Sequence, residues 1–117
     1  MLKDIKLFLG ISDTLQDDLL NLIIIDSEER ILSKINEYAV LNETSKLKEI
    51  PKEYTYIHRD VAIKRFNKIN SEGATSDSEE GRSFNWEQSY LDEYLSLFDT
   101  LTKPKKKAGK GIARFYE

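Results

Sequence analysis

The residues of this chain that could carry chemistry include one histidine and several pairs of adjacent carboxylates. His58 is the single imidazole. An imidazole base needs a nucleophile and an orienting group within reach, and the sequence indicates neither of them. The pairs Asp17-Asp18, Glu28-Glu29 and Glu79-Glu80 stand at neighbouring positions, which do not face each other on a helix. We therefore interpret His58 as a hydrogen-bonded residue at the edge of the core and these carboxylates as solvated.

Cofactor and metal chemistry finds equally little support in the residue types. The chain has no cysteine, so it has no thiolate nucleophile and no disulfide framework. A single histidine without cysteine cannot supply the usual ligands of a structural zinc site. The triplet Gly109-Lys110-Gly111 lacks the spacing of a phosphate-binding loop and has no strand before it. We expect no enzymatic activity, no cofactor and no metal.

The length of 117 residues indicates one domain that is large enough to bury a core. Charged residues make up 33% of the chain and hydrophobic residues 39%, which indicates a thin core and much solvated or partner-covered surface. The longest apolar run, Leu22 to Ile25, is too short to cross a membrane. The opening residues lack the hydrophobic stretch of a secretory signal. We expect a protein that is made in the cytoplasm and does not enter a membrane.

The last fifteen residues differ in composition from the rest of the chain. Residues 103–117 hold six cations and one anion, a net charge of +5, whereas residues 1–102 hold 12 Lys and Arg against 20 Asp and Glu, a net charge of −8. This tail has too little apolar surface to offset the entropy of ordering it on the body. We interpret it as a flexible docking tail whose contact residues are Lys105, Lys106, Lys107, Lys110, Ile112, Arg114, Phe115 and Tyr116.

The elements expected before this tail are helices. Apolar residues near the start predict a short helix over residues 2–8, which Gly10 can end in the left-handed conformation. A long helix is predicted from about Thr14 to Tyr38, with an N-cap oxygen from Ser12 or Asp13. Its main apolar face recurs at steps of three or four and consists of Leu20, Ile24, Ser27, Ile31, Ile35 and Tyr38.

The first half of this long helix has apolar residues on its other sides as well. They are Leu15, Leu19, Leu22 and Ile25, and Leu22 lies nearly opposite the main apolar face. A helix that is apolar all round must be covered all round. Two covers remain open from the sequence: the short first helix, and a neighbouring subunit.

A third helix is predicted over about residues 51–69, with Pro51 at its first position, after a polar connection over residues 39–50. His58 and Arg65 fall within its apolar face, where an unpaired cation is costly. We expect Arg65 to pair with a carboxylate of the same subunit, Glu72 being the first choice; a pair across subunits is the alternative. The apolar face consists of Tyr54, Ile57, Val61, Ala62, Phe66 and Ile69.

The Ser- and Gly-rich stretch over about residues 70–86 predicts an extended loop or β-hairpin arm. We interpret Trp86 in this arm as a core or interface anchor rather than a platform for nucleic-acid bases. A fourth helix is predicted over residues 87–101, before Pro104. The predicted fold is thus all-α: a small bundle of three to four helices over residues 1–102, with the arm and the flexible tail. The fourth helix has the apolar face Tyr90, Leu91, Tyr94, Leu95, Phe98 and Leu101.

Several segments, taken in order, carry a resemblance to a known family. The chain opens with Leu-Lys-Asp-Ile-Lys-Leu-Phe-Leu-Gly-Ile at residues 2–11, and the long helix follows at Asp17-Asp18-Leu19-Leu20. The most specific part runs from Arg65 to Ser78, where Arg-Phe-Asn leads into Ser-Glu-Gly and the Ser-rich arm. In this order and spacing, as far as about Trp86, the sequence resembles the head–tail connector proteins of long-tailed phages, especially those of Gram-positive hosts.

The resemblance implies a structural virion protein without catalytic activity, located at the head–tail interface. Members of this family form a ring, commonly of twelve subunits, beneath the portal protein, and the ring contacts a downstream neck or tail-completion protein. DNA passes through the channel without sequence-specific binding. Carried over, the resemblance implies that Arg65, Asn67 and Glu72 hold the third helix and the arm in place, and that the tail reaches the portal. It also implies an inter-subunit arm with the contact residues Gly73, Ser76, Ser78, Phe84 and Trp86.

A second function remains possible from the residues alone. The lysines of the tail could bind phosphates, as in a small nucleic-acid-binding regulatory protein. This hypothesis explains the tail but neither the over-apolar long helix nor the arm. The net charge of −8 over residues 1–102 also argues against it, because nucleic-acid-binding domains usually carry a basic face.

Overall fold

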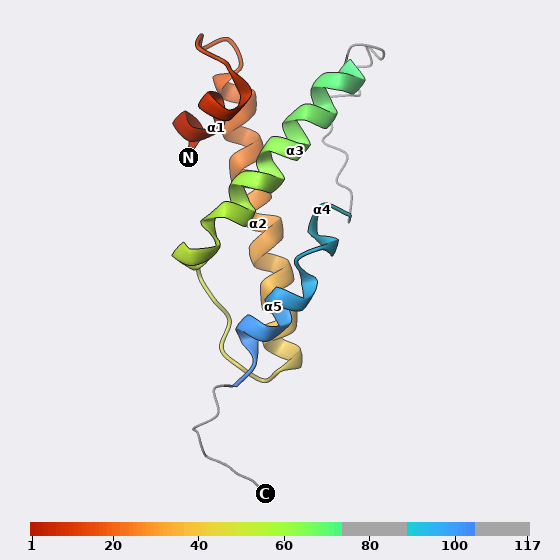
Figure 1. Cartoon of the computed structure of the whole chain (residues 1–117). Coiled ribbons are helices and arrows are strands. Elements are labelled where there is room, and N and C mark those ends of the chain that lie inside the picture. The colour runs from red at the N-terminus through yellow and green to blue at the C-terminus, as the bar shows by residue number, and fades with distance from the viewer. Residues whose placement is uncertain (74–88, 105–117) are drawn as a thin grey trace, which may run out of the picture.

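The computed structural model describes residues 1–73 and 89–104. Within these ranges the regular elements are all helical and follow the order α1, α2, η1, α3, α4 and α5 (Figure 1). The all-α prediction is therefore confirmed. Most of the predicted arm, from residue 74 onwards, and the tail, from residue 105 onwards, lie outside the described residues.

α1 spans Leu2–Leu9 and ends as the sequence predicts. Gly10 adopts φ 73° and ψ 28°, the left-handed region that glycine enters without a Cβ clash. Its backbone N–H donates to the carbonyl of Leu7, and the N–H of Ile11 donates to the carbonyl of Lys6 at 2.9 Å. These bonds satisfy carbonyls at the end of the helix and redirect the chain towards α2.

α2 spans Asp17–Leu41, so it begins and ends later than predicted. The predicted N-cap is wrong, because the capping position is Gln16, whose side chain makes no capping hydrogen bond. The Asp13 carboxylate instead accepts a bond from the N–H of Leu15 at 3.1 Å. Such a local side-chain bond offers the backbone an alternative to the helix and closes a turn before it.

α3 spans Thr55–Gly73 and follows η1, a 3-10 turn over Lys52–Tyr54. The prediction that Pro51 is the first residue of this helix is wrong. Pro51 precedes the 3-10 turn, with an extended ψ of 145°. The helix also runs four residues beyond its predicted end, so the expectation that the loop begins at Asn70 is wrong. Exposed polar residues such as Asn70 and Ser71 cost an exposed helix only about 0.5 kcal/mol each and do not force it to stop.

The predicted fourth helix is two helices, α4 over Ser89–Asp92 and α5 over Leu95–Thr102. Tyr94 separates them with φ −107° and ψ 0°, and its backbone N–H donates to the carbonyl of Leu91. The apolar spacing continues through this break, so the periodicity predicted a single helix. After α5 the backbone of Lys103 is extended, which is the conformation favoured before proline.

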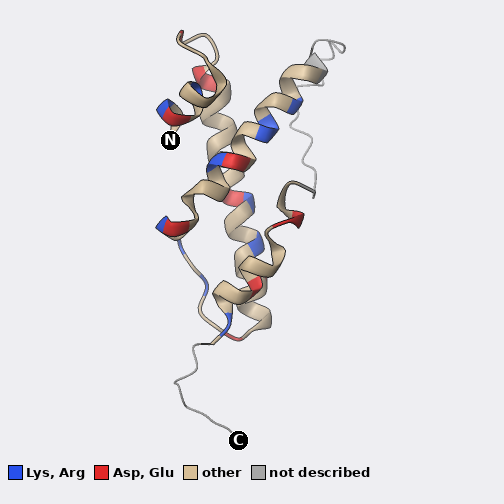
Figure 2. Cartoon of the chain, viewed as in Figure 1, with Lys and Arg blue, Asp and Glu red and all other residues tan. Residues whose placement is uncertain are grey.

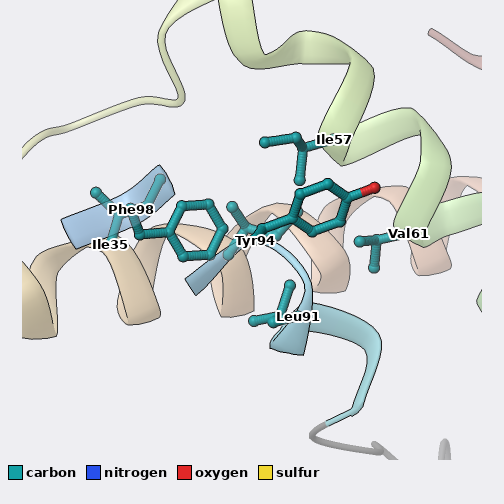
Figure 3. Packing of buried hydrophobic residues seen from close by; sticks show 7 residues of the cluster. Ile35, Ile57, Val61, Leu91, Tyr94 and Phe98 are labelled. Atoms are coloured by element: carbon teal, nitrogen blue, oxygen red, sulfur yellow. The ribbon is translucent and has the colours of Figure 1, made fainter. Parts of the chain in front are cut away.

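The helices bury two groups of apolar side chains along α2, which α3 crosses, with α1 near one end and α5 near the other (Figure 1). The α5-end core is shown in Figure 3 and consists of Ile31, Ile35, Ile57, Val61, Leu91, Tyr94 and Phe98. The α1-end core consists of Ile5, Leu20, Ile23, Ala62 and Phe66.

A polar cluster fastens α5 to the end of α2. The Asn42 amide donates to the Asp99 carboxylate at 3.0 Å and to the Thr102 hydroxyl at 2.9 Å. The hydroxyl of Thr44 donates to the carbonyl of Thr102 at 2.7 Å. The hydrogen bond from Asn42, together with Lys103, lowers the pKa of Asp99. These bonds join residues that are distant in sequence and close the α5-end core.

Candidate subunit-interaction surface

The single histidine takes part in packing. His58 on α3 is buried, and its Nε2 lies 2.8 Å from the carbonyl oxygen of Ile24 on α2. This confirms the interpretation of His58 as a hydrogen-bonded residue at the edge of the core. Among the described residues, no group of three or more acidic or histidine side chains is arranged to hold a metal ion.

The adjacent carboxylates of α2 lie in different surroundings, as expected for neighbours on a helix. Asp17 forms an ion pair with Lys6 at 2.8 Å, which links α2 to α1. Asp18 and Glu29 are exposed, in agreement with the solvated interpretation. The pair Glu79-Glu80 lies outside the described residues.

Arg65 has the largest fully buried side chain among the described residues, with 1% of its surface exposed. Its Nη1 donates to the Asp26 carboxylate at 2.8 Å and to the Ser27 hydroxyl at 2.9 Å. The prediction of a carboxylate partner in the same subunit is confirmed. That partner, Asp26, comes from α2. The side chain of Glu72, the partner expected from the sequence, lies outside the described part of the chain, so the Arg65–Glu72 pair stays a prediction.

The charges around Arg65 stabilise one another. Burial by itself would raise the pKa of Asp26, but hydrogen bonds from Arg30 and Arg65 outweigh it and hold that pKa below its usual value. Burial lowers the pKa of Arg65, and Asp26 opposes this shift. Because a guanidinium remains charged at any pH that a protein experiences, Arg65 acts as a fixed cation that joins α3 to α2.

One side of α2 is exposed although it contains apolar residues. Asp18, Leu22, Ile25 and Glu29 recur at steps of four, three and four, which places them on one helical face, and all four are exposed. Leu22 is 49% and Ile25 53% exposed. We call these four residues the α2 outer face. They lie on the side of the helix opposite its buried residues.

α1 covers another side of α2. Leu19 and Ile24 are partly buried against the α1-end core, to which α1 contributes Ile5. The sequence left open whether α1 or a neighbouring subunit covers the additional apolar side chains of this helix. For Leu19, the cover is α1. Leu22 and Ile25 have no cover within the described subunit and remain available to a neighbour.

A second face, on α3, is partly exposed: Tyr56 and Asn67 are exposed, whereas Arg59 and Ile63 are half-buried. Tyr56, Arg59, Ile63 and Asn67 recur at steps of three, four and four on the side opposite its buried residues. Together with Phe8 of α1 they line a groove of about 620 Å³, which we call the α3 outer groove. The Phe8 ring is 69% exposed, and the Arg59 guanidinium lies 5.8 Å from the centre of this ring, within cation–π range.

Ion pairs occupy one edge of this groove. The Lys64 ammonium lies 3.2 Å from both the Asp60 and the Glu93 carboxylates. Burial alone would lower the pKa of Lys64, but these two carboxylates outweigh it and raise that pKa. The Tyr94 hydroxyl donates a hydrogen bond to the Asp60 carboxylate. Burial and this bond raise the pKa of Tyr94 above its usual range. The charged and polar groups at this edge of the groove are therefore paired within the subunit.

The remaining charges are distributed without a single dominant sign. Figure 2 shows acidic and basic positions interspersed along α1, α2 and α3. Among the described residues, Arg59 in the α3 outer groove forms no ion pair, and neither do Asp18 and Glu29 on the α2 outer face. These unpaired charges lie beside the exposed apolar residues of their respective faces.

The predicted contact residues are described only in part. Gly73 is the last residue of α3, and Asn67 is an exposed residue of the α3 outer groove. The other predicted arm residues, Ser76, Ser78, Phe84 and Trp86, lie outside the described ranges, as do all the predicted contact residues of the tail. Their roles stay predictions.

The α3 outer groove was not predicted from the sequence. Tyr56 and Ile63 are seven residues apart, a spacing that returns to the same helical face, and this signal was available. The contribution of Phe8 to this groove could not be predicted from the sequence, because it depends on how α1 packs beside α3. Asp26 was missed for the same reason, since its partner Arg65 is on another helix.

In the described ranges, no helix is both long and apolar enough to span a bilayer. Comparison with curated proteins and with solved structures gives no match. A family model described as phage gp6-like head-tail connector protein matches residues 1–101. The matched stretch holds the two cores, both exposed faces and the buried Arg65 pair. Because it covers most of the chain, the chain belongs to the phage gp6-like head-tail connector family, whose members are structural proteins of the junction between phage head and tail.

Proposed function

We propose that the chain forms a ring of twelve subunits that joins the portal protein to the next neck or tail-completion protein. The ring would continue the channel through which DNA passes, without sequence-specific contacts. The observation that carries this proposal is the family match over residues 1–101. The exposed apolar residues of α2 and the α3 outer groove support it, because a subunit that stays alone has no use for them.

Two segments outside the described residues complete the proposal. The arm over about residues 74–86 contacts the adjacent subunit, with Phe84 and Trp86 as anchors, because aromatic residues dominate interface energetics. The tail binds the portal: its lysines raise the association rate, and the stretch Ile112–Tyr116 fixes it in place. The channel wall is acidic or neutral, since the net charge of −8 over residues 1–102 keeps DNA phosphates from settling on it.

Electron microscopy of the purified protein with its candidate portal tests this proposal. We expect a ring attached to the portal. Removal of residues 112–117 keeps every lysine of the tail and deletes its aromatic residues. This truncation should abolish portal binding with little change in DNA affinity, whereas normal portal binding by the truncated chain would refute the docking role of the tail.

A matched variant separates portal docking from DNA binding. Replacing Lys105, Lys106 and Lys107 by glutamine removes charge and keeps the aromatic residues. It should slow portal association and leave the bound complex largely intact. Tight, steeply salt-dependent DNA binding by a monomer or dimer, lost in this variant, would instead support the nucleic-acid-binding regulator.

A further inference from the structure

Two of the exposed apolar surfaces of the described subunit point in different directions. The α2 outer face lies on the side of α2 away from its buried residues, and the α3 outer groove lies on the corresponding side of α3. Since α2 and α3 pack against each other through their buried sides, the sides opposite those buried residues face away from one another. A subunit of this kind can contact one neighbour on each side.

We infer that the α2 outer face of one subunit binds in the α3 outer groove of a second copy of the chain. This inference rests on the proposed ring and specifies which surfaces close it. A ring is built from a heterologous interface, in which two different patches meet and the contact is repeated around the axis. The two patches on the described subunit satisfy that requirement, because they are different and point in opposite directions.

The shapes and residue types of the two surfaces are complementary. The α2 outer face presents Leu22 and Ile25 as a ridge on a helix of 25 residues. The α3 outer groove is lined by the exposed rings of Phe8 and Tyr56 and by the half-buried Ile63, and this apolar lining can receive that ridge. Aromatic residues that line a groove are typical anchors of protein interfaces.

The charges point to the same pairing. Asp18 and Glu29 flank the apolar ridge, and Arg59 lies in the groove, all three without an ion pair among the described residues. Docking the ridge in the groove brings opposite charges together. A two-fold pairing of two α2 outer faces, with the helices antiparallel, would set Asp18 against Glu29 of the partner subunit. That contact opposes like charges, so the structure favours the heterologous pairing.

Two charge-introducing variants test the pairing. Ile25→Asp disables the α2 outer face and leaves the groove intact, whereas Tyr56→Asp disables the groove and leaves the α2 outer face intact. Both side chains are exposed, so both variants should fold, which circular dichroism and thermal melting check. Each change should raise the concentration needed for assembly by about 30-fold or more, the effect of losing one interface hot spot. Ser96→Asp, at an exposed position of α5, is the matched control and should assemble as the parent does.

The decisive sample is an equimolar mixture of the two variants, analysed by sedimentation velocity beside the full-length parent. The inference predicts assemblies larger than a dimer for the parent, monomers for each variant, and heterodimers for the mixture. In that heterodimer, the intact groove of Ile25→Asp holds the intact α2 outer face of Tyr56→Asp, and no second contact can form. A mixture that stays monomeric while the parent assembles would overturn the inference, and so would homodimers of Tyr56→Asp alone.

Failure of the pairing is distinguishable from failure of the proposed function. A parent chain that is monomeric at every concentration reached would also overturn the pairing. If electron microscopy nevertheless shows a ring on the portal, the proposed function stands and other surfaces close the ring. A protein that assembles through the two faces but binds no portal would support the pairing and refute the proposed function.

Discussion

The α5-end core contains two aromatic residues, Tyr94 and Phe98, with ring centres 6.4 Å apart, and the hydrogen bonds of Asn42 close it. The α1-end core is smaller, and several exposed apolar side chains of α1 and of the first half of α2, among them Phe8 and Leu22, lie at the same end of the subunit. The α5 end thus uses most of its apolar residues to fold the subunit, although Val40 and Leu41 in the last turn of α2 are exposed. The α1 end carries more apolar residues than the subunit itself can bury, which leaves them for contacts with neighbours.

The largest expected effect on stability comes from comparing alanine substitutions of two phenylalanines, one from each end of the subunit. Phe98→Ala should lower the free energy of unfolding by about 3–5 kcal/mol, because it empties space in the α5-end core. Phe8→Ala should lower it by less than about 1 kcal/mol, since its ring is mostly exposed and only its contact with Arg59 is lost. Urea unfolding of both variants measures the difference. Equal losses would show that the two ends are not built differently.

Arg65 lies where α3 meets α2, and its removal should affect both ends. Arg65→Ala should destabilise the fold by about 3 kcal/mol or more, because it leaves Asp26 and Ser27 without their buried partner. Arg59→Ala is the matched control, since its guanidinium forms no ion pair in the described part of the chain, and it should change stability little. A melting temperature of Arg65→Ala within about one degree of the parent would contradict this prediction.

The Asp26 carboxylate makes the same pair sensitive to acid. Asp26→Asn keeps an oxygen acceptor for Arg65 but loses the charge, so it should cost about 2 kcal/mol at neutral pH. The folded-state pKa of Asp26 lies below the ordinary 3.8. Its contribution to stability is therefore present above pH 3.8 and disappears as the pH falls through the lowered folded-state value. The stability difference between parent and variant should shrink over that window, and a difference that stays constant would contradict the assignment.

The smallest effect concerns the polar closure of the α5 end. Asn42→Ala removes the hydrogen bonds to Asp99 and Thr102 and should cost about 1 kcal/mol. Amide hydrogen exchange should accelerate in α5 and remain unchanged in α1, because the lost bonds hold only the α5 end. Asn21→Ala, at an exposed position of α2, serves as the control. Faster exchange throughout the chain would show that the two ends unfold together.

Several features could be predicted from the sequence because they depend on local spacing. The apolar faces of α2, α3 and the α4–α5 stretch recur every three or four residues, and the buried residues Leu20, Val61 and Phe98 confirm them. The end of α1 at Gly10 follows from the freedom of glycine at positive φ. The need of Arg65 for a carboxylate follows from the cost of burying an unpaired cation.

Other features were decided by contacts between helices. Asp26 is the partner of Arg65 because α2 and α3 cross where they do, and no local pattern contains that crossing. Tyr94 separates α4 from α5 although the apolar periodicity runs through it, and its hydroxyl is bonded to Asp60 on α3. The α3 outer groove exists because α1 brings Phe8 beside α3.

By itself, the sequence determined the helical class, most of the residues that face the core and the excess of apolar residues on the long helix, because each depends on spacing along one segment. On α2 it missed the fully buried Ile23 and Ala39. Tertiary structure alone decided where α2 begins and ends, where α4 and α5 separate, that Asp26 pairs with Arg65, and which of the excess apolar residues stay exposed. The physical reason is that α1 shields Leu19 but does not reach Leu22 or Ile25, and only the packing of the helices fixes how far such a cover extends.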